Sequence, residues 1–192
     1  MFEELKSYAE LNKVPIIRDE GLKFLLLEIE KHLVKSVLEV GTAIGYSALC
    51  MAQKGLFVTT IERNQDMYNE AVSNIKKYGY TERIDTVYMD ALTYTPDRTY
   101  DLIFIDAAKA QNKKFFLRFT PFLNDGGIVI VDNLNFHNLV FEDINSIKSK
   151  NLRSLVRKIN EFKEWLKSNP DYETEFTDMG DGMSVSKKKK WF

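Results

Sequence analysis

One stretch of the sequence decides the fold: Ser36-Val37-Leu38-Glu39-Val40-Gly41-Thr42-Ala43-Ile44-Gly45-Tyr46-Ser47. It opens with a short apolar run that is typical of a buried strand, and helix-compatible residues follow through residues 47–52. Between them, Gly41 and Gly45 permit a tight turn and a close approach of the backbone to a ligand. We therefore predict a strand, a turn and a helix that together bind part of a nucleotide.

The spacing of the two glycines separates this turn from a related cofactor motif. Dinucleotide-binding turns carry G-x-G-x-x-G, whereas this turn carries G-x-x-x-G, which disfavours a nicotinamide cofactor. The next apolar run, residues 57–61, ends at Glu62, about twenty residues beyond Gly41, where a doubly wound fold places an acid on ribose hydroxyls. The two signals together predict a nucleotide-containing cofactor. A merely structural turn with an exposed Glu62 is the alternative.

The composition limits the classes of protein that remain. With 192 residues, 44% of them hydrophobic and 29% charged, we predict one globular domain over residues 1–192. The net charge of −1 argues against a protein that is basic all over but leaves room for a local basic face. The single cysteine, Cys50, excludes an intrachain disulfide and a cysteine-based zinc site. Because no apolar run is long enough to cross a bilayer, we expect a cytoplasmic protein with no membrane partner.

Hydrophobic periodicity predicts alternating helices and strands along the chain. We expect helices at residues 2–11, 19–33, 47–52, 66–78, 115–123 and 152–167, the fifth of them bent near Pro121. We expect strands at residues 37–40, 57–61, 84–89, 100–105, 128–131, 172–177 and 183–186, with residues 124–127 forming a turn. This order predicts an α/β fold: a Rossmann-like, doubly wound, mainly parallel sheet with an antiparallel edge strand and helices on both faces.

Polar side chains stand at the ends of five predicted strands: Glu39, Glu62, Asp90, Asp106 and Asp132-Asn133. Because the carboxyl ends of parallel strands meet at one edge, we expect these side chains to gather there. Asp106, Asp132 and Asn133 form an all-oxygen set suited to magnesium or manganese, although a turn cap at Asp132-Asn133 is the alternative. Lys109, three residues after Asp106, is a candidate base or partner of a substrate oxyanion, or else a solvated surface lysine.

Four segments resemble one known family: Glu39-Val40-Gly41-Thr42-Ala43-Ile44-Gly45-Tyr46-Ser47, Thr60-Ile61-Glu62-Arg63, Phe104-Ile105-Asp106-Ala107-Ala108-Lys109 and Gly126-Gly127-Ile128-Val129-Ile130-Val131-Asp132-Asn133. Together they resemble the cation-dependent O-methyltransferases that use S-adenosylmethionine, which include the catechol and caffeoyl-CoA enzymes. Within that group the chain resembles most the bacterial tRNA 5-hydroxyuridine methyltransferases. The residues that carry this second resemblance are Tyr8-Ala9, Val14-Pro15-Ile16, Asp171-Tyr172 and Gly180-Asp181-Gly182.

The resemblance implies a role for each motif residue. The implied S-adenosylmethionine-binding residues are Ile16, Glu39, Gly41, Thr42, Ser47, Glu62, Asp90, Ala91 and Asp106. Of these, Glu39, Gly41 and Ser47 would hold the methionine part under Ile16, Glu62 would bind the ribose, and Asp90-Ala91 would border the adenine. The implied ligands of Mg²⁺ or Mn²⁺ are Asp106, Asp132 and Asn133. The implied catalytic residues are Lys109, which matches the base of the catechol enzymes, and Asp106.

The implied reaction is methylation of 5-hydroxyuridine at the tRNA wobble position to 5-methoxyuridine. The 5-hydroxyl and the 4-carbonyl of this base are neighbours and can chelate one cation as a catechol does. Ala107 and Ala108 leave room for a nucleotide where the catechol enzymes carry a bulky aromatic residue. Two alternatives remain: a small-molecule O-methyltransferase that acts on a catechol-like phenol, and a non-catalytic RNA-binding protein on the same scaffold.

Two groups of basic residues are candidates for contacting the phosphates of a tRNA anticodon stem-loop: Lys148, Lys150, Arg153, Arg157 and Lys158, and the tail 187–190. A solvated surface is the alternative for both. Ala110 and His137-Asn138 depart from the tRNA-modifying subgroup, which has a glycine after Asp-Ala-Ala-Lys and a basic residue followed by glycine. We expect Trp165 in the core, His137 near the substrate, and a homodimer.

Overall fold

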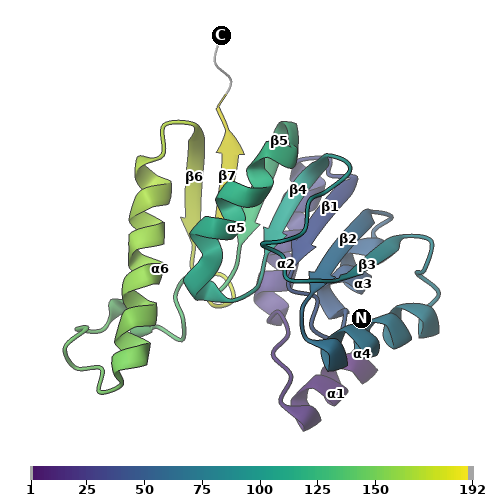
Figure 1. The fold of residues 1–192 in the computed structure, drawn as a ribbon, viewed down its shortest axis with the longest axis horizontal. Coiled ribbons are helices and arrows are strands. Elements are labelled where there is room, and N and C mark those ends of the chain that lie inside the picture. The colour runs from purple at the N-terminus through teal and green to yellow at the C-terminus, as the bar shows by residue number, and fades with distance from the viewer. Residues whose placement is uncertain (1, 190–192) are drawn as a thin grey trace.

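The computed structural model describes residues 2–189, whose strands form one seven-stranded sheet in the order β3-β2-β1-β4-β5-β7-β6 (Figure 1). The strands are β1 Ser36–Val40, β2 Phe57–Glu62, β3 Ile84–Tyr88, β4 Tyr100–Ile105, β5 Leu123–Val131, β6 Tyr172–Thr177 and β7 Met183–Lys188. Strands β1 to β5 pair in parallel, and β7 is inserted antiparallel between β5 and the edge strand β6. The prediction of a mainly parallel, doubly wound sheet with an antiparallel edge strand is confirmed.

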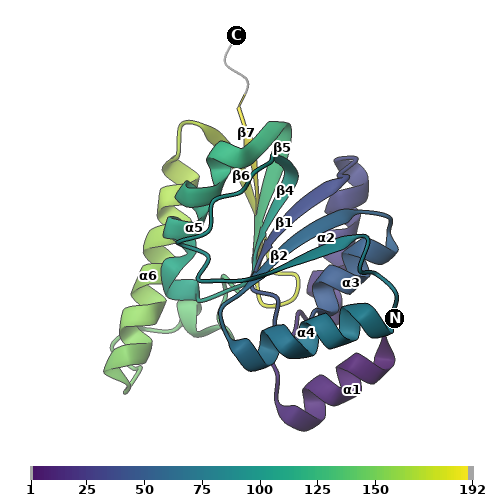
Figure 2. The same cartoon turned by 45° about the vertical axis from the view of Figure 1, so that its right-hand side comes forward.

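Helices cover both faces of the sheet, as predicted; Figure 2 has α5 and α6 on one side and α1 to α4 on the other. They are α1 Glu3–Asn12, α2 Asp19–Lys31, α3 Tyr46–Gln53, α4 Gln65–Lys77, α5 Asn112–Phe119 and α6 Lys150–Ser168, with short 3-10 helices η1 Lys109–Gln111, η2 Thr120–Phe122 and η3 Leu139–Phe141. Successive strand residues point to opposite faces. Val37 therefore belongs to the core shared with α1, α2 and α3, and Leu38 to the core shared with α5 and α6.

The sequence of α6 explains why this segment is helical and how it packs. Its buried residues recur at helical spacing: Val156, Ile159, Phe162 and Leu166. Ser149 caps the first turn, since its Oγ accepts a hydrogen bond from the backbone N of Leu152 at 3.3 Å. Trp165, which the sequence predicts in the core, is only partly buried and packs against the core, with its ring centroid 5.3 Å from that of Phe116 on α5 and 5.9 Å from that of Phe162. An aromatic contact thus joins α6 to α5.

One predicted boundary is wrong, because the turn expected at residues 124–127 belongs to β5, which begins at Leu123. Tyr100 pairs with Leu123 and Leu102 pairs with Ile128, so residues 124–127 lie opposite Asp101 alone. The side chain of Asn124 donates from Nδ2 to Oδ1 of Asp101 at 2.8 Å and holds this irregular part of the strand in place. The helix before it ends earlier than predicted, and η2 forms the expected bend around Pro121.

The carboxyl ends of the parallel strands meet at one edge of the sheet, where the first residues after the strands still form backbone hydrogen bonds to the neighbouring strands. The backbone N of Asp106 donates to the oxygen of Val40, and that of Asp132 donates to the oxygen of Ile105, both at 3.0 Å. Helix α6 begins near this edge, because it follows the loop that leaves β5 (Figure 1). Glu62, Asp90, Asp106 and Asp132 therefore lie on one rim, as the sequence predicts, whereas Glu39 is buried within β1.

The basic tail runs away from that rim. Ser184 pairs with Val131 at the carboxyl end of β5, whereas Lys187 pairs with Ile128 further back along the strand. Lys187, Lys188 and Lys189 therefore lie toward the opposite edge of the sheet, and Lys190 lies outside the described residues. Within residues 2–189, no helix has the length and apolar character needed to cross a membrane.

Candidate active site

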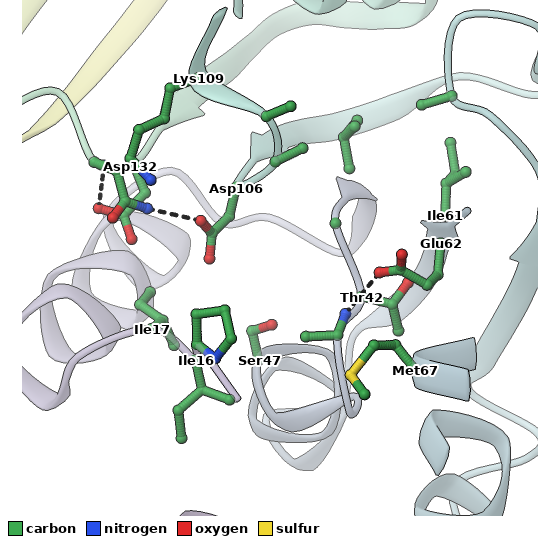
Figure 3. Close-up of a pocket in the computed structure, with 18 of the residues that line it drawn as sticks. Ile16, Ile17, Thr42, Ser47, Ile61, Glu62, Met67, Asp106, Lys109 and Asp132 are labelled. Atoms are coloured by element: carbon green, nitrogen blue, oxygen red, sulfur yellow. Dashed lines mark hydrogen bonds between the residues drawn. The ribbon is translucent and has the colours of Figure 1, made fainter. Parts of the chain in front are cut away.

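A cavity of about 560 Å³ opens at the carboxyl edge of the sheet, within the size range of small-molecule sites (Figure 3). Its walls are the β1–α3 turn, the ends of β2, β4 and β5, and the segment before α2. The predicted site residues in its lining are Ile16, Gly41, Thr42, Ser47, Glu62, Asp90, Ala91, Asp106, Lys109, Asp132 and Asn133. Glu39 is the one predicted site residue that does not line it.

The β1–α3 turn can approach β4 because residue 41 is a glycine. Gly41 has φ +105°, a conformation that L side chains rarely adopt, and a Cβ atom there would overlap the backbone oxygen of Asp106. Its backbone N donates to the oxygen of Ile61 at 3.1 Å, so the turn is also tied to β2. The turn is therefore held against both neighbouring strands while its backbone lines the cavity.

Glu62, at the end of β2, has its carboxylate oriented by three backbone donors. Its Oε2 accepts from the N of Ala43 at 3.0 Å, and its Oε1 accepts from Arg63 and Asn64 at 3.0 and 2.8 Å. Because Oε2 has a single protein donor, it can accept a further hydrogen bond from a ligand hydroxyl. The lining that follows β2 and β3 includes four apolar residues, Ile61, Met67, Met89 and Ala91, together with the charged Arg63 and Asp90.

Glu39 lies beneath the cavity floor, with no exposed surface. Its carboxyl group accepts hydrogen bonds from Oγ of Ser47 at 2.5 Å and from Oγ1 of Thr60 at 2.6 Å, and Thr60 in turn bonds Thr42 at 2.6 Å. Burial raises the pKa of Glu39 to about 8, although the two hydroxyl donors oppose this effect. Glu39 therefore orients Ser47 and Thr42, and its direct contact with a cofactor stays a prediction.

Asp106, Asp132 and Asn133 converge at the end of the cavity opposite Glu62 (Figure 3). Nδ2 of Asn133 donates to Oδ1 of Asp106 at 2.8 Å, and the backbone N of Asn133 donates to Oδ1 of Asp132 at 2.6 Å. Burial raises the pKa of Asp106 to about 6, and burial together with repulsion from Asp106 raises the pKa of Asp132 to about 7. This end of the cavity therefore favours a bound positive charge.

Lys109, in η1, is the cation nearest to this pair in Figure 3. Its charge opposes the effect of burial and lowers the pKa of both Asp106 and Asp132. Its Nζ lies 5.5 Å from the ring centroid of Phe136, and no ion pair involves it within the part of the chain that the structure describes. Lys109 thus lines the cavity with an ammonium group that can meet a ligand.

Two further lining residues, Arg18 and Asp181, have no predicted role, and they accompany His137, which lines the cavity where the sequence predicts a residue near the substrate. Nη2 of Arg18 lies 3.0 Å from Nδ1 of His137, and Oδ1 of Asp181 accepts from the backbone N of His137 at 2.7 Å. Asp181 stands in the Gly180-Asp181-Gly182 motif, so a sequence signal existed, but no spacing rule connects it to β5. Its place depends on β7, which returns antiparallel beside β5.

The comparison with known families decides the identity of this site. A sequence profile described as O-methyltransferase matches residues 2–189, nearly the whole chain. The chain belongs to the O-methyltransferase family. It is an S-adenosylmethionine-dependent enzyme of the group that includes the caffeoyl-CoA and catechol O-methyltransferases.

Relatives of this O-methyltransferase match over most of its length. A caffeoyl-CoA O-methyltransferase of Populus kitakamiensis is 27% identical over 194 residues, which cover 95% of this chain and 82% of the relative. The catechol O-methyltransferase of Mycobacterium tuberculosis is 30% identical over 133 residues, which cover 66% of this chain and 60% of the relative. A crystal structure of a Staphylococcus aureus protein proposed to be a caffeoyl-CoA O-methyltransferase is 41% identical, with a TM-score of 0.92 over 97% of this chain and 91% of that chain.

Proposed function

We propose that this O-methyltransferase transfers the methyl group of S-adenosylmethionine to the 5-hydroxyl of 5-hydroxyuridine at the wobble position of tRNA. The observation that carries the proposal is the acceptor end of the cavity, where Asp106, Asp132 and Lys109 meet beside the small side chains of Ala107 and Ala108. A nucleobase with two adjacent oxygens fits a site where charged groups stand beside two alanines. The resemblance to the tRNA-modifying subgroup favours the same substrate.

The donor fits the other end of the cavity. In the proposed complex, the ribose hydroxyls bind Glu62, the adenine lies beside Asp90 and Ala91, and the methionine part lies against Gly41, Thr42 and Ser47 under Ile16. The backbone donors on Glu62 keep its carboxylate in one orientation, so less conformational entropy is lost when the ribose binds. This arrangement directs the sulfonium methyl toward Asp106.

A divalent cation fits the acceptor end. The donor set is two carboxylates and one amide, all able to offer hard oxygen ligands, and the two buried carboxylates repel each other without a cation. Within residues 2–189 no cluster of three or more His, Cys, Asp or Glu residues is arranged for a metal, so the two carboxylates would be joined by the amide oxygen of Asn133 as a further protein ligand. Bound Mg²⁺ or Mn²⁺ would supply Lewis-acid stabilisation of the deprotonated acceptor hydroxyl.

The residues of the chain contribute mainly orientation and charge to the proposed reaction. The acceptor oxygen forms a bond to the methyl carbon as the carbon–sulfur bond breaks, which yields S-adenosylhomocysteine. Asp106 and Asp132 orient the acceptor end, and Lys109 either receives the hydroxyl proton as a neutral amine or balances the oxyanion as an ammonium.

Exposed basic residues support an RNA partner. Lys148, Lys150 and Arg157 are exposed in or beside the first turns of α6, which begins near the same edge as the cavity. Arg153 differs from them, because its Nη1 donates to the carbonyls of Ile147 and Lys148 at 2.6 and 3.2 Å and holds the loop before α6. We therefore assign phosphate contact to the exposed residues and a structural role to Arg153.

A catechol-like small-molecule substrate is the second candidate, since it would use the same cofactor and cation residues. Methylation assays of the purified protein with an anticodon stem-loop that contains 5-hydroxyuridine, and with a free catechol, distinguish the two. We expect a much higher kcat/KM for the stem-loop and 5-methoxyuridine in the digested product by mass spectrometry. A preference for the catechol would overturn the tRNA assignment. A cytoplasmic homodimer is part of the proposal, and light scattering of the purified protein tests the dimer.

A further inference from the structure

A second cavity, of about 570 Å³, lies directly beside the acceptor end of the proposed active site. Arg18, His137 and Asp181 line both cavities, so the two cavities are neighbours and only these side chains are common to them. The proposed reaction uses only the first cavity. The second is therefore available for another part of the substrate.

The outer wall of the second cavity carries an aromatic ring at the surface. Phe141, at the end of η3, is 65% exposed and lines this cavity. Nζ of Lys163 lies 5.4 Å from the ring centroid and also donates to Oδ1 of Asn135 at 3.3 Å. The ring is therefore supported from one side by a half-buried lysine, while much of its surface remains open to a ligand.

Hydrogen-bond donors and acceptors line the rest of this cavity. Nη2 of Arg18 faces Nδ1 of His137 at 3.0 Å, and the side chain of Asp178 accepts from Nδ2 of Asn135 at 2.9 Å. The side-chain amide of Asn138 makes no hydrogen bond within residues 2–189 and offers both a donor and an acceptor. An exposed ring beside donors and acceptors is the arrangement by which proteins bind unstacked bases of single-stranded RNA.

We propose that the second cavity binds the base of a nucleotide next to the methylated one, with that base stacked on Phe141 and its edge bonded to Asn138. This inference rests on the proposed function and specifies how the RNA is held. A base fits better than a phosphate, because the carboxylates of Asp178 and Asp181 would repel an anion in the same cavity. The enzyme would then need a single-stranded loop, where neighbouring bases can leave the stack.

The test compares full-length protein with Phe141→Ala and Phe141→Trp on an anticodon stem-loop that contains 5-hydroxyuridine. Matched substrates have an abasic ribose on the 5′ or the 3′ side of the acceptor. We expect Phe141→Ala to lower kcat/KM about tenfold on the intact stem-loop, as loss of one base–aromatic stack would. Phe141→Trp should restore kcat/KM to the parent value. On one of the two abasic substrates, where the stacking base is missing, the parent and Phe141→Ala should have the same kcat/KM.

Phe57→Ala is the matched control, because Phe57 is also an exposed ring, 57% accessible, but belongs to the amino end of β2. It should leave the stem-loop kinetics unchanged. Equal effects of Phe141→Ala on the intact and on both abasic substrates, or no effect at all, would overturn the stacking proposal while the parent still methylates RNA. If the parent protein methylates only catechols, the proposed function itself is wrong, and the stacking proposal falls with it.

Discussion

Asn133 donates from Nδ2 to Oδ1 of Asp106 across 2.8 Å and so joins the residues that follow β5 and β4. The same asparagine donates from its backbone to Asp132. One residue therefore sets the relative position of the two carboxylates at the acceptor end of the cavity.

Asp132→Ala should abolish methyl transfer and leave S-adenosylmethionine binding nearly unchanged, because Asp132 lies at the acceptor end. Chelation of the parent protein by EDTA should have the same effect, and added Mg²⁺ or Mn²⁺ should restore activity to the parent but not to the variant. Single-turnover assays and calorimetry measure the two properties. Full activity of thoroughly chelated enzyme would leave Asp132 and Asn133 as a structural turn.

Glu62→Ala should weaken S-adenosylmethionine binding by on the order of 1.5–3 kcal/mol, since the ribose hydroxyls lose a charged acceptor. Glu62→Gln keeps the shape and one acceptor oxygen and should lose less. Calorimetric titration of both variants measures the affinities, and their unfolding midpoints control for the lost backbone hydrogen bonds. An unchanged affinity for Glu62→Ala would mean that the ribose binds elsewhere.

Replacing Lys148, Lys150 and Arg157 together with Ala should raise the Michaelis constant for tRNA. A plot of the logarithm of the tRNA association constant against the logarithm of salt concentration should become less steep by about 2, because three phosphate contacts to a single strand are lost. The matched control replaces Lys187, Lys188 and Lys189, which lie toward the opposite edge of the sheet. If both triple variants behave like the parent, the basic residues of α6 are only a solvated surface.

Arg153→Ala should mainly lower the stability of the protein, unlike the triple variants of exposed lysines and arginine. It removes two hydrogen bonds to loop carbonyls and should lower the free energy of unfolding by roughly 1–3 kcal/mol. Its effect on tRNA binding should be smaller than that of the triple variant. Chemical denaturation and a binding titration on the same sample compare the two, and a stable variant with weak tRNA binding would reassign Arg153 to the RNA surface.

Glu39→Gln should change how stability depends on pH. Burial raises the pKa of Glu39 to about 8 from the ordinary value of 4.5, so the folded chain retains a proton that the unfolded chain loses. This contribution to stability is complete below pH 4.5 and is lost as the pH rises toward 8. Glu39→Gln cannot ionise, so its unfolding free energy should fall less between pH 5 and pH 8.5 than that of the parent. Identical pH profiles would mean that Glu39 is ionised in the folded protein.

The sheet and the acidic rim could be predicted because both depend on local patterns. Apolar runs such as residues 100–105 mark buried strands, and polar residues at their ends mark the carboxyl edge. The irregular part of β5 could not be predicted, since Asn124 is held by a side chain of another strand, Asp101. The glycines at positions 126 and 127 are typical of turns, and only the pairing of β4 with β5 shows that residues 124–127 belong to a strand.

The candidate site could be predicted only in part, because sequence patterns do not reveal contacts between segments that are distant in the chain. Gly41, Glu62 and Asp106 follow strands along the chain, so their position at the rim could be inferred. Arg18 and Asp181 come from segments far from β5 in sequence and reach the cavity through tertiary packing. Glu39 reads as a cavity residue, but the pleat of β1 directs its side chain beneath the floor, onto Ser47.

The close approach of Gly41 to the backbone of Asp106 has a consequence for the rate of methyl transfer. The turn that would hold the donor and the strand that would hold the acceptor touch through main-chain atoms, with no side chain between them. Transfer requires the reacting atoms about 3–3.5 Å apart, and an error of about 1 Å costs roughly a hundredfold in rate. The distance between donor and acceptor would therefore depend on this main-chain contact, and substitutions in the loops that follow β5 could change the substrate without altering that distance.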